Sequence, residues 1–198
     1  MEKHTDATGA RMGMWLFLYT EIMLFGGMFV LYAAYYHRYT ADFLTAGRVP
    51  DLFRGTLNTA MLIISSFAVA AAVEAMRKNS KKLVLLLLSV TVILGAAFLF
   101  NKYFEWSHDF AGGYYPGSDS MAAGPAGRSI FFALYFTMTG LHALHVIIGM
   151  SVLCACMIFT YRGRITGERI TILENSGLFW HLVDIVWIFL FPLFYLLL

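Results

Sequence analysis

Charged residues are scarce in this chain, and their scarcity indicates its class. Of 198 residues only 13% are charged, while 60% are hydrophobic and the mean hydropathy is +0.70. A water-soluble domain needs a polar coat, which so few charges cannot supply over the long apolar runs seen here. The composition therefore excludes an ordinary soluble domain and indicates a membrane protein.

The chain also lacks a large excess of charge of either sign, and it has few cysteines. Its net charge is +2, and the basic residues lie in short clusters between apolar runs. This pattern excludes nucleic acid as a partner and favours a phospholipid surface. Cys154 and Cys156 lie in an apolar run, so they supply neither a disulfide framework nor a four-thiolate metal site, and we expect them to pack in the core.

Five apolar segments are long enough to cross a bilayer, since a hydrocarbon core of about 30 Å requires about 20 helical residues. The predicted spans are residues 12–36, 57–73, 83–100, 129–161 and 178–198. They are continuously apolar rather than alternating, which predicts helices and not the strands of a membrane barrel. The predicted fold is an all-α membrane protein, a bundle of five transmembrane helices that forms one domain over residues 1–198.

Lys and Arg are unequally divided between the two sides that five spans define. The side of the N-terminus carries Lys3, Arg11, Arg77, Lys78, Lys81, Lys82, Arg162, Arg164 and Arg169, and the other side carries Arg38, Arg48, Arg54, Lys102 and Arg128. The positive-inside rule then predicts a cytoplasmic N-terminus and an external C-terminus. The first span is too long for a secretory signal, so we expect it to be retained.

One loop concentrates basic residues, namely Arg77, Lys78, Lys81 and Lys82. Two interpretations remain open for it. The loop could bind anionic lipid head groups, at about 1 kcal/mol per charge, or it could act only as a topology signal.

Ionisable side chains are rare within the spans, where they are costly and often functional. Glu21 lies ten residues beyond Arg11, and Asp184 lies ten beyond Glu174. Both carboxyls are therefore predicted at the same depth, roughly 15 Å along their helices. Because its sequence neighbours are apolar, we expect Glu21 to be protonated or paired and to have a functional role.

Three histidines also lie within the spans: His142, His145 and His181. His142 and His145 are three residues apart, as are His181 and Asp184, so each pair shares a helix face. Each pair could form a functional polar ladder or simply hydrogen bond neighbouring helices. No zinc or heme ligand spacing surrounds them, and no nucleotide, flavin or nucleophile motif occurs, so we expect neither a metal nor a catalytic centre in this chain.

Four passages, each on a different predicted span, together resemble a known family. They are GMWLFLYTEIMLF from Gly13, LNTAMLIISS from Leu57, TGLHALHVIIG from Thr139 and WHLVDIVWIFLF from Trp180. In this order they resemble subunit III of the heme-copper respiratory oxidases, the cytochrome c and quinol oxidases. The chain looks like the five-helix form of that subunit, without the first two helices of the longer form.

The resemblance implies a subunit without heme or copper of its own. Heme and copper are expected in the partner subunits, which are the catalytic subunit I and a copper-bearing or quinol-oxidase subunit II. Bound phospholipid is expected as well. In the longer form of the subunit a lipid-filled cleft separates the first two helices from the other five, and this chain lacks those two helices. The implied location is a bacterial inner membrane.

The resemblance also extends to single residues. Glu21 stands at the family's buried, carbodiimide-reactive glutamate, with Thr20 where the family usually has Ser. The family's recurrent polar and aromatic positions correspond to Asn58, Glu105, His142, His145, His181, Asp184 and Trp187.

Our leading hypothesis is that the chain buttresses the proton-entry side of the catalytic subunit and holds lipid against it. A second hypothesis is a proton relay formed by Glu21, His181 and Asp184. A third keeps the fold but assigns the chain to a nitric oxide reductase system. The sequence leaves open whether cytochrome c or quinol donates the electrons.

Overall fold

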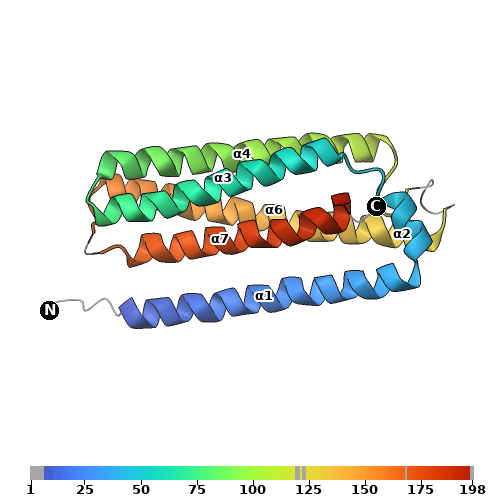
Figure 1. Ribbon diagram of the computed structural model, residues 1–198, viewed down its shortest axis with the longest axis horizontal. Coiled ribbons are helices and arrows are strands. Elements are labelled where there is room, and N and C mark those ends of the chain that lie inside the picture. Colours follow the sequence, from blue (N-terminus) through green and yellow to red (C-terminus); the bar gives the residue numbers. More distant parts are fainter. Residues whose placement is uncertain (1–6, 119–120, 122–123, 168, 197–198) are drawn as a thin grey trace.

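The computed structural model describes residues 7–118, 121, 124–167 and 169–196. Five long helices lie side by side with their axes nearly aligned (Figure 1). They are α1 (Ala7–Arg38), α3 (Leu52–Arg77), α4 (Lys81–Ala111), α6 (Ala126–Tyr161) and α7 (Thr171–Phe191). A short α2 (Thr40–Ala46) follows α1, and a π-helical turn, η1 (Pro192–Leu196), follows α7. The described residues contain no strand, and all five predicted spans are confirmed as helices long and apolar enough to cross a membrane.

Consecutive long helices run in opposite directions, so α1, α4 and α7 begin at one end of the bundle (Figure 1). We call this the N-terminal end. Helices α3 and α6 begin at the opposite end, where α2 and η1 also lie, and we call it the α2 end.

Local sequence explains several helix ends. The side chain of Asp51 precedes α3 and accepts hydrogen bonds from the backbone N–H groups of Phe53 and Arg54, which otherwise lack helical partners. Asn79 adopts a positive φ of 53° between α3 and α4, a conformation that Asn tolerates better than most residues. Pro192 lacks a backbone N–H, and α7 changes there into the wider π turn.

Helix α4 is much longer than the predicted span, which ended at residue 100. It continues to Ala111, so Lys102 does not belong to a loop. Lys102 lies inside the bundle with 2% of its surface exposed, and its assignment to a loop was wrong. The physical reason is that the charges after Phe100 find partners within the bundle, so they do not mark the point where the helix leaves it.

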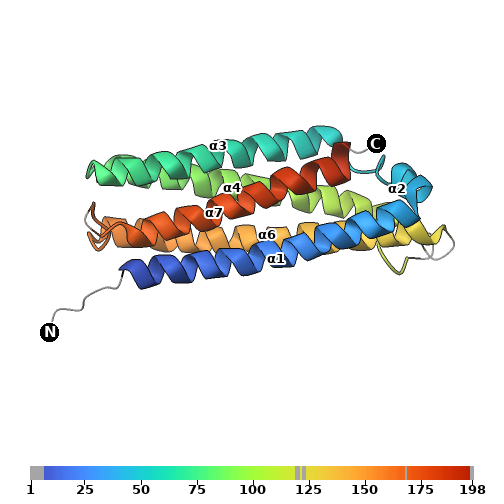
Figure 2. The same ribbon diagram turned by 60° about the horizontal axis from the view of Figure 1, so that its bottom comes forward.

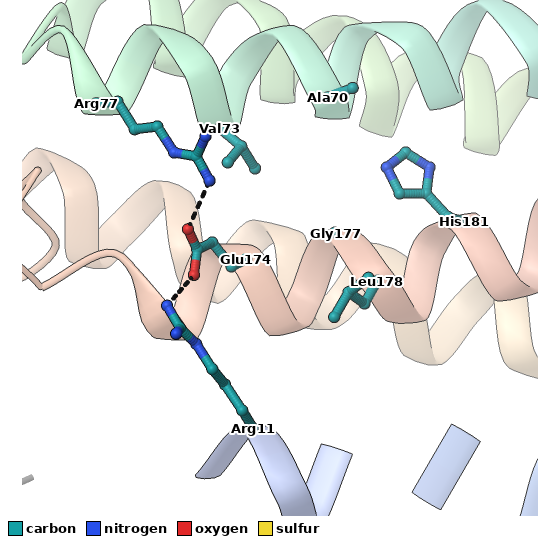
Figure 3. A pocket seen from close by; sticks show the side chains of 8 residues that line it. All are labelled: Arg11, Ala70, Val73, Arg77, Glu174, Gly177, Leu178 and His181. Carbon is teal, nitrogen blue, oxygen red and sulfur yellow. Dashed lines mark hydrogen bonds and ion pairs between the residues drawn. The ribbon is translucent and has the colours of Figure 1, made fainter. Parts of the chain in front are cut away.

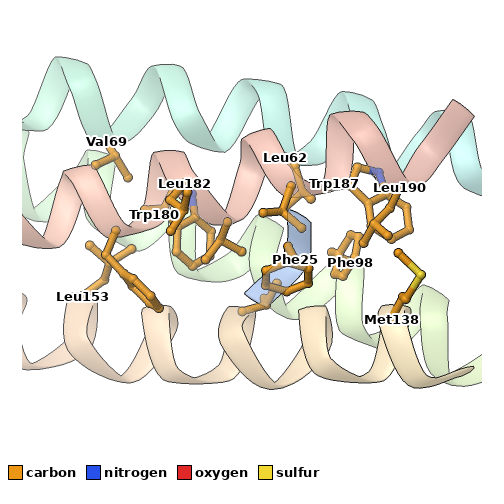
Figure 4. Close-up of a cluster of buried hydrophobic side chains, with 14 of the residues drawn as sticks. Phe25, Leu62, Val69, Phe98, Met138, Leu153, Trp180, Leu182, Trp187 and Leu190 are labelled. Atoms are coloured by element: carbon orange, nitrogen blue, oxygen red, sulfur yellow. The ribbon is translucent and has the colours of Figure 1, made fainter. Parts of the chain in front are cut away.

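The centre of the bundle is filled by aromatic and aliphatic side chains from α3, α4, α6 and α7 (Figure 4). Trp180 of α7 is wholly buried and donates a hydrogen bond from Nε1 to Oγ of Ser65, at 3.0 Å. Its ring lies against Gly95 of α4 and Gly149 of α6, where an added Cβ would approach it to 3.0 and 2.8 Å. Small residues on two helices therefore make the space for one large ring on a third.

Helix α1 lies at the edge of the bundle, beside α6 and α7 (Figures 1 and 2). Leu18, Phe25 and Tyr32 are its buried apolar residues, and they are spaced seven apart, so they form a single narrow stripe. A few partly buried side chains, such as Met28 and Phe29, pack beside this stripe, and most of the other apolar residues of α1 are exposed. Helix α1 is accordingly the least buried of the five spans and α7 the most.

The two cysteines differ in their surroundings. Cys156 is buried, with Sγ 3.2 Å from Oγ of Ser176, as expected for a core residue. Cys154 is exposed. The expectation that both cysteines pack in the core was wrong for Cys154, because residues two apart on a helix point in different directions.

Candidate functional site

Glu21 is joined to His145 across the interface between α1 and α6. The distance between Glu21 Oε2 and His145 Nε2 is 2.9 Å, and the two side chains are 14% and 10% exposed. Phe25 packs edge-on against the imidazole, with ring centroids 5.3 Å apart. The carboxyl expected to be protonated or paired is therefore paired, and its partner is one of the predicted histidines.

The contact made by Nδ1, the other ring nitrogen of His145, shows which nitrogen carries a hydrogen. Nδ1 lies 2.8 Å from the backbone oxygen of Leu141, and a carbonyl oxygen can only accept a hydrogen bond. Nδ1 therefore donates. Nε2 then either accepts a hydrogen bond from a protonated Glu21 or donates one to its carboxylate. The pair can hold one proton in two positions.

His142 shares a helix face with His145 but has different neighbours. It is fully buried between Phe98 and Trp187, whose ring centroids lie 5.5 and 5.1 Å from its own. Neither of its ring nitrogens has a hydrogen-bond partner among the described residues. His142 thus lies inside the aromatic core, while His145 faces α1.

His181 and Asp184 lie on α7 next to Ser66 of α3. The Ser66 hydroxyl is 2.7 Å from Nδ1 of His181. Asp184 is 3% exposed, and within the described part of the chain neither carboxyl oxygen has a hydrogen-bond partner. A buried polar group in that state is destabilising by about 1–3 kcal/mol unless water or a proton satisfies it.

Glu105 belongs to a saturated polar network at the α2 end of the bundle, formed with Lys102, Tyr135 and Tyr195. Lys102 Nζ donates to Glu105 Oε2 at 3.1 Å and to the Tyr135 and Tyr195 hydroxyls at 2.9 Å each. Both hydroxyls in turn donate to Oε1 of Glu105. Every polar hydrogen of the network is used, so a buried ion pair is fully compensated here.

Sequence reasoning missed Lys102, Tyr135 and Tyr195. Both tyrosines are embedded in apolar runs, where they resemble ordinary packing residues. The available signal was the spacing of Lys102 and Glu105, which are three residues apart and would pair on a helix continued past Phe100.

Asn58 and Trp187 both connect helices. Asn58 is fully buried, and its side-chain oxygen accepts a hydrogen bond of 2.7 Å from Asn101 of α4. Trp187 Nε1 donates to Oγ1 of Thr59 at 3.0 Å, which links α7 to α3. These contacts are those of residues that hold the bundle together.

A cavity of about 510 Å³ opens between α1, α3 and α7 at the N-terminal end (Figure 3). Glu174 lies at its mouth, with one oxygen 2.8 Å from Arg11 and the other 2.9 Å from Arg77. The remaining wall is formed by Ala70, Val73, Gly177, Leu178 and His181. Two cations and one anion line this mouth, with Glu74 3.7 Å from Arg77 outside it, and the wall below is mostly apolar.

An apolar groove of about 350 Å³ lies between α1 and α7, further toward the α2 end. It is lined by Ile22, Phe25, Gly26 and Phe29 of α1 and by Leu182, Ile185, Val186 and Phe189 of α7. Leu178 of the cavity and Leu182 of the groove are four residues apart, so the two hollows follow one face of α7. A basic mouth and an apolar groove therefore lie one after the other along α7.

The four basic residues of the loop after α3 differ in location, since one lines the cavity and the others lie on the surface. Arg77 is bound to Glu174 inside the cavity mouth, and Lys78 is 3.5 Å from Glu74 on the outside of α3. Lys81 and Lys82 are exposed. Of the four residues predicted to meet lipid head groups, Arg77 is the one that lines the cavity.

No three His, Cys, Asp or Glu side chains within the described ranges converge as metal ligands do. The histidines of the spans are instead occupied by Glu21, by Ser66 or by aromatic rings. The placement of heme and copper in partner subunits stays a prediction.

The five apolar helices and the polar residues buried between them define a multi-pass helical membrane protein. Residues 2–197 match the model of the family described as cytochrome c oxidase subunit III. The chain belongs to that family.

Similar proteins come from both kinds of oxidase. The cytochrome bo(3) ubiquinol oxidase subunit 3 of Pseudomonas aeruginosa is 32% identical over 194 residues, which cover 98% of this chain and 88% of the relative. The cytochrome c oxidase subunit 3 of Alkalihalophilus pseudofirmus is 30% identical over 189 residues, 94% of this chain and 85% of the relative. The heme-copper oxidase subunit I+III of Aeropyrum pernix is 29% identical over 192 residues, 94% of this chain and 22% of the relative.

Proposed function

We propose that this chain is a non-catalytic subunit III of a heme-copper terminal oxidase in aerobic respiratory electron transport. It stabilises the catalytic subunit, holds phospholipid beside it and keeps proton uptake fast. Membership of the subunit III family supports the assignment to an oxidase. The lipid role rests on one observation, the basic cavity mouth that continues into an apolar groove between α1 and α7.

The proposed partners are the catalytic subunit I and a copper-bearing or quinol-oxidase subunit II, which carry the heme and copper. A relative whose name joins subunits I and III in one chain supports the contact with subunit I. Relatives named for quinol and for cytochrome c oxidases match equally well, so the electron donor follows from the partner and not from this chain.

The proposed location is a bacterial inner membrane, with the N-terminal end of the bundle in the cytoplasm. The basic residues that follow α3 and α6 support this orientation, because Lys and Arg concentrate on the cytoplasmic side of membrane proteins. Bacterial relatives that cover most of the chain support the location.

The chemistry of the cavity suits an anionic phospholipid. Arg11 and Arg77 both bind Glu174, and Arg77 also lies 3.7 Å from Glu74. Because a guanidinium has five N–H donors, each arginine keeps donors for a phosphate. An acyl chain extending from that head group would follow Leu178 and Leu182 into the groove, where it would be shielded from the rest of the bilayer. Basic pockets between membrane helices bind anionic head groups in this manner.

Replacing Arg77 by Gln tests the lipid role in the purified oxidase. Removing one cation near the phosphate weakens lipid binding by about 1 kcal/mol, or roughly fivefold in occupancy under limiting lipid. We expect less phospholipid per heme and a shorter catalytic lifetime during turnover. Phospholipid analysis and oxygen consumption measure the two quantities.

Lys82→Gln is the matched control, because Lys82 belongs to the same basic loop but is exposed outside the cavity. It should change neither lipid content nor lifetime. Equal effects of the two substitutions would reject the cavity as the lipid site. An unchanged turnover number and lifetime after removal of the whole subunit would reject the supporting role itself.

A proton relay formed by Glu21, His181 and Asp184 is the second candidate, and the observation in its favour is that all three side chains are buried or partly buried within the spans. A Glu21→Gln variant with unaltered pumping stoichiometry would reject it. A nitric oxide reductase partner is the remaining alternative, which the identity of the co-purifying catalytic subunit decides.

A further inference from the structure

A second, smaller cavity lies at the α2 end of the bundle, opposite the basic cavity mouth. It has a volume of about 100 Å³ and is lined by Val49, Asp51, Arg54, Glu105, His108 and Asp109. Asp51 and Arg54 have half and about a third of their side-chain surface exposed, at 50% and 37%. Glu105 and Asp109 are 2% and 3% exposed. The cavity therefore leads from an exposed rim to a buried acidic floor.

Asp109 is the group on this floor whose bonding is incomplete. Its Oδ2 atom is buried and has no hydrogen-bond partner among the residues that the structure describes. A buried carboxyl oxygen left in that state is unfavourable, so it requires a water molecule or a proton.

Charged and titratable groups surround Asp109, but among the described residues none of them hydrogen bonds to its Oδ2 atom. Arg54, from α3, is 3.3 Å from Asp51. On α4, Glu105 is bound to Lys102, and it also accepts hydrogen bonds from Tyr135 of α6 and Tyr195 of η1. His108, also on α4, lines the cavity. Lys102 has no further hydrogen to give, so the network cannot satisfy Asp109.

Water can satisfy it. A cavity of this size accommodates about three water molecules at about 30 Å³ each, and polar groups on several sides supply their hydrogen-bond partners. Such waters would join the Asp109 carboxyl to the exposed rim at Asp51 and Arg54.

We propose that this cavity is a hydrated proton-exchange site in which Asp109 takes up a proton from the aqueous phase at the α2 end and returns it there. The proton passes along the cavity waters to Oδ2, which converts the carboxylate to the carboxylic acid, and no electron moves. The saturated Lys102 network closes the inner side of the site. This activity lies beyond the proposed lipid and assembly roles, and the basic cavity of the lipid role lies at the other end of the bundle.

Infrared spectroscopy of the full-length chain in lipid nanodiscs tests the proposal. Acidification should produce a carboxylic C=O band that reverses when the pH is raised and shifts to lower frequency on transfer to D₂O. One component of the band should be lost in Asp109→Asn and retained in Asp42→Asn, whose carboxyl lies outside the cavity and accepts a hydrogen bond from the backbone N–H of Gly127. Retention of the full band in a folded Asp109→Asn protein would overturn the proposal, as would a band that does not respond to D₂O.

A second pair of variants tests the water path without touching the carboxyl. Val49 lines the cavity and is partly buried, so Val49→Phe should fill it and slow the exchange, while Val49→Ala should leave the exchange fast. Circular dichroism verifies that both variants fold. Equal exchange rates in the two proteins would contradict a path through the cavity.

Discussion

At the level of single residues, the buried polar groups differ in whether their hydrogen-bond partners are present. Glu105 has both oxygens satisfied by Lys102 and two tyrosine hydroxyls, whereas Asp184 and His142 have no hydrogen-bond partner among the described residues. A saturated network holds helices in one arrangement, while an unsatisfied group destabilises them unless it serves another purpose. The Glu105 network is therefore structural, and the unsatisfied groups are the better candidates for proton chemistry.

Removing Lys102 should have a large effect on stability. Lys102→Met leaves the Glu105 carboxylate buried without a counter-charge, so we expect a loss of about 3–5 kcal/mol. The double variant Lys102→Met/Glu105→Gln removes both charges and should recover much of that loss. Thermal unfolding of the purified chain measures both. A single variant as stable as the wild type would show that the buried pair is not what holds this end together.

Glu21 and His145 permit a test of the bond that joins α1 to α6. In Glu21→Gln the side-chain amide can still donate to Nε2 of a neutral His145, so stability should change little. In Glu21→Leu the nitrogen loses its partner, and we expect a loss of about 1–3 kcal/mol. The comparison uses thermal unfolding at constant pH. Equal losses in the two variants would mean that the bond requires a charged glutamate.

At the scale of elements, α1 differs from the other four helices. It contributes one narrow apolar stripe to the core and is tied to the bundle by polar contacts at three levels. These are Arg11 with Glu174, Glu21 with His145, and the Tyr32 hydroxyl with the backbone oxygen of Leu193. A helix held in this way leaves grooves at its sides, which explains why the cavity and the apolar groove both border α1.

Substituting two glycines of α6 by Ala distinguishes the effect of close packing on stability from the effect of helix propensity. A Cβ on Gly149 would lie 2.8 Å from the Trp180 ring, while one on Gly140 would lie 3.6 Å from Trp106, an ordinary contact. Gly149→Ala should therefore cost about 1–3 kcal/mol by overpacking. Gly140→Ala should be neutral or stabilising by up to about 1 kcal/mol, because Ala favours the helix. Thermal unfolding that ranks the two variants in the opposite order would contradict this packing.

The five helices could be predicted from the sequence because each contains a continuous apolar run, which in a membrane is compatible only with a helix or a closed barrel. The end of α4 could not be predicted in the same way. Its charges Lys102 and Glu105 pair with each other, and they are hydrogen bonded by Tyr135 and Tyr195, which are distant in sequence. The Glu21–His145 pair was likewise not predicted, since sequence spacing relates residues of one helix and not of two.

At the scale of the whole molecule, buried polar groups are distributed along the full length of the bundle. The basic cavity and His181 lie toward the N-terminal end, and the Lys102 network and Asp109 toward the α2 end. Between them lie Leu62, Phe98, Met138 and Trp187, which are buried (Figure 4), and the buried polar residues Asn58, His142 and Asp184 lie at the same level. The polar groups are therefore separated by large apolar and aromatic side chains, as expected for a helix bundle with a packed core.

The proposal that this chain functions as subunit III of a heme-copper oxidase is tested by identifying the proteins with which it associates. The chain is purified from its native membrane in mild detergent, an optical spectrum is recorded, and the co-purifying proteins are identified by mass spectrometry. We expect heme bands, a heme-copper catalytic subunit and oxygen consumption in the same preparation. A heme-free preparation without such a partner would contradict it.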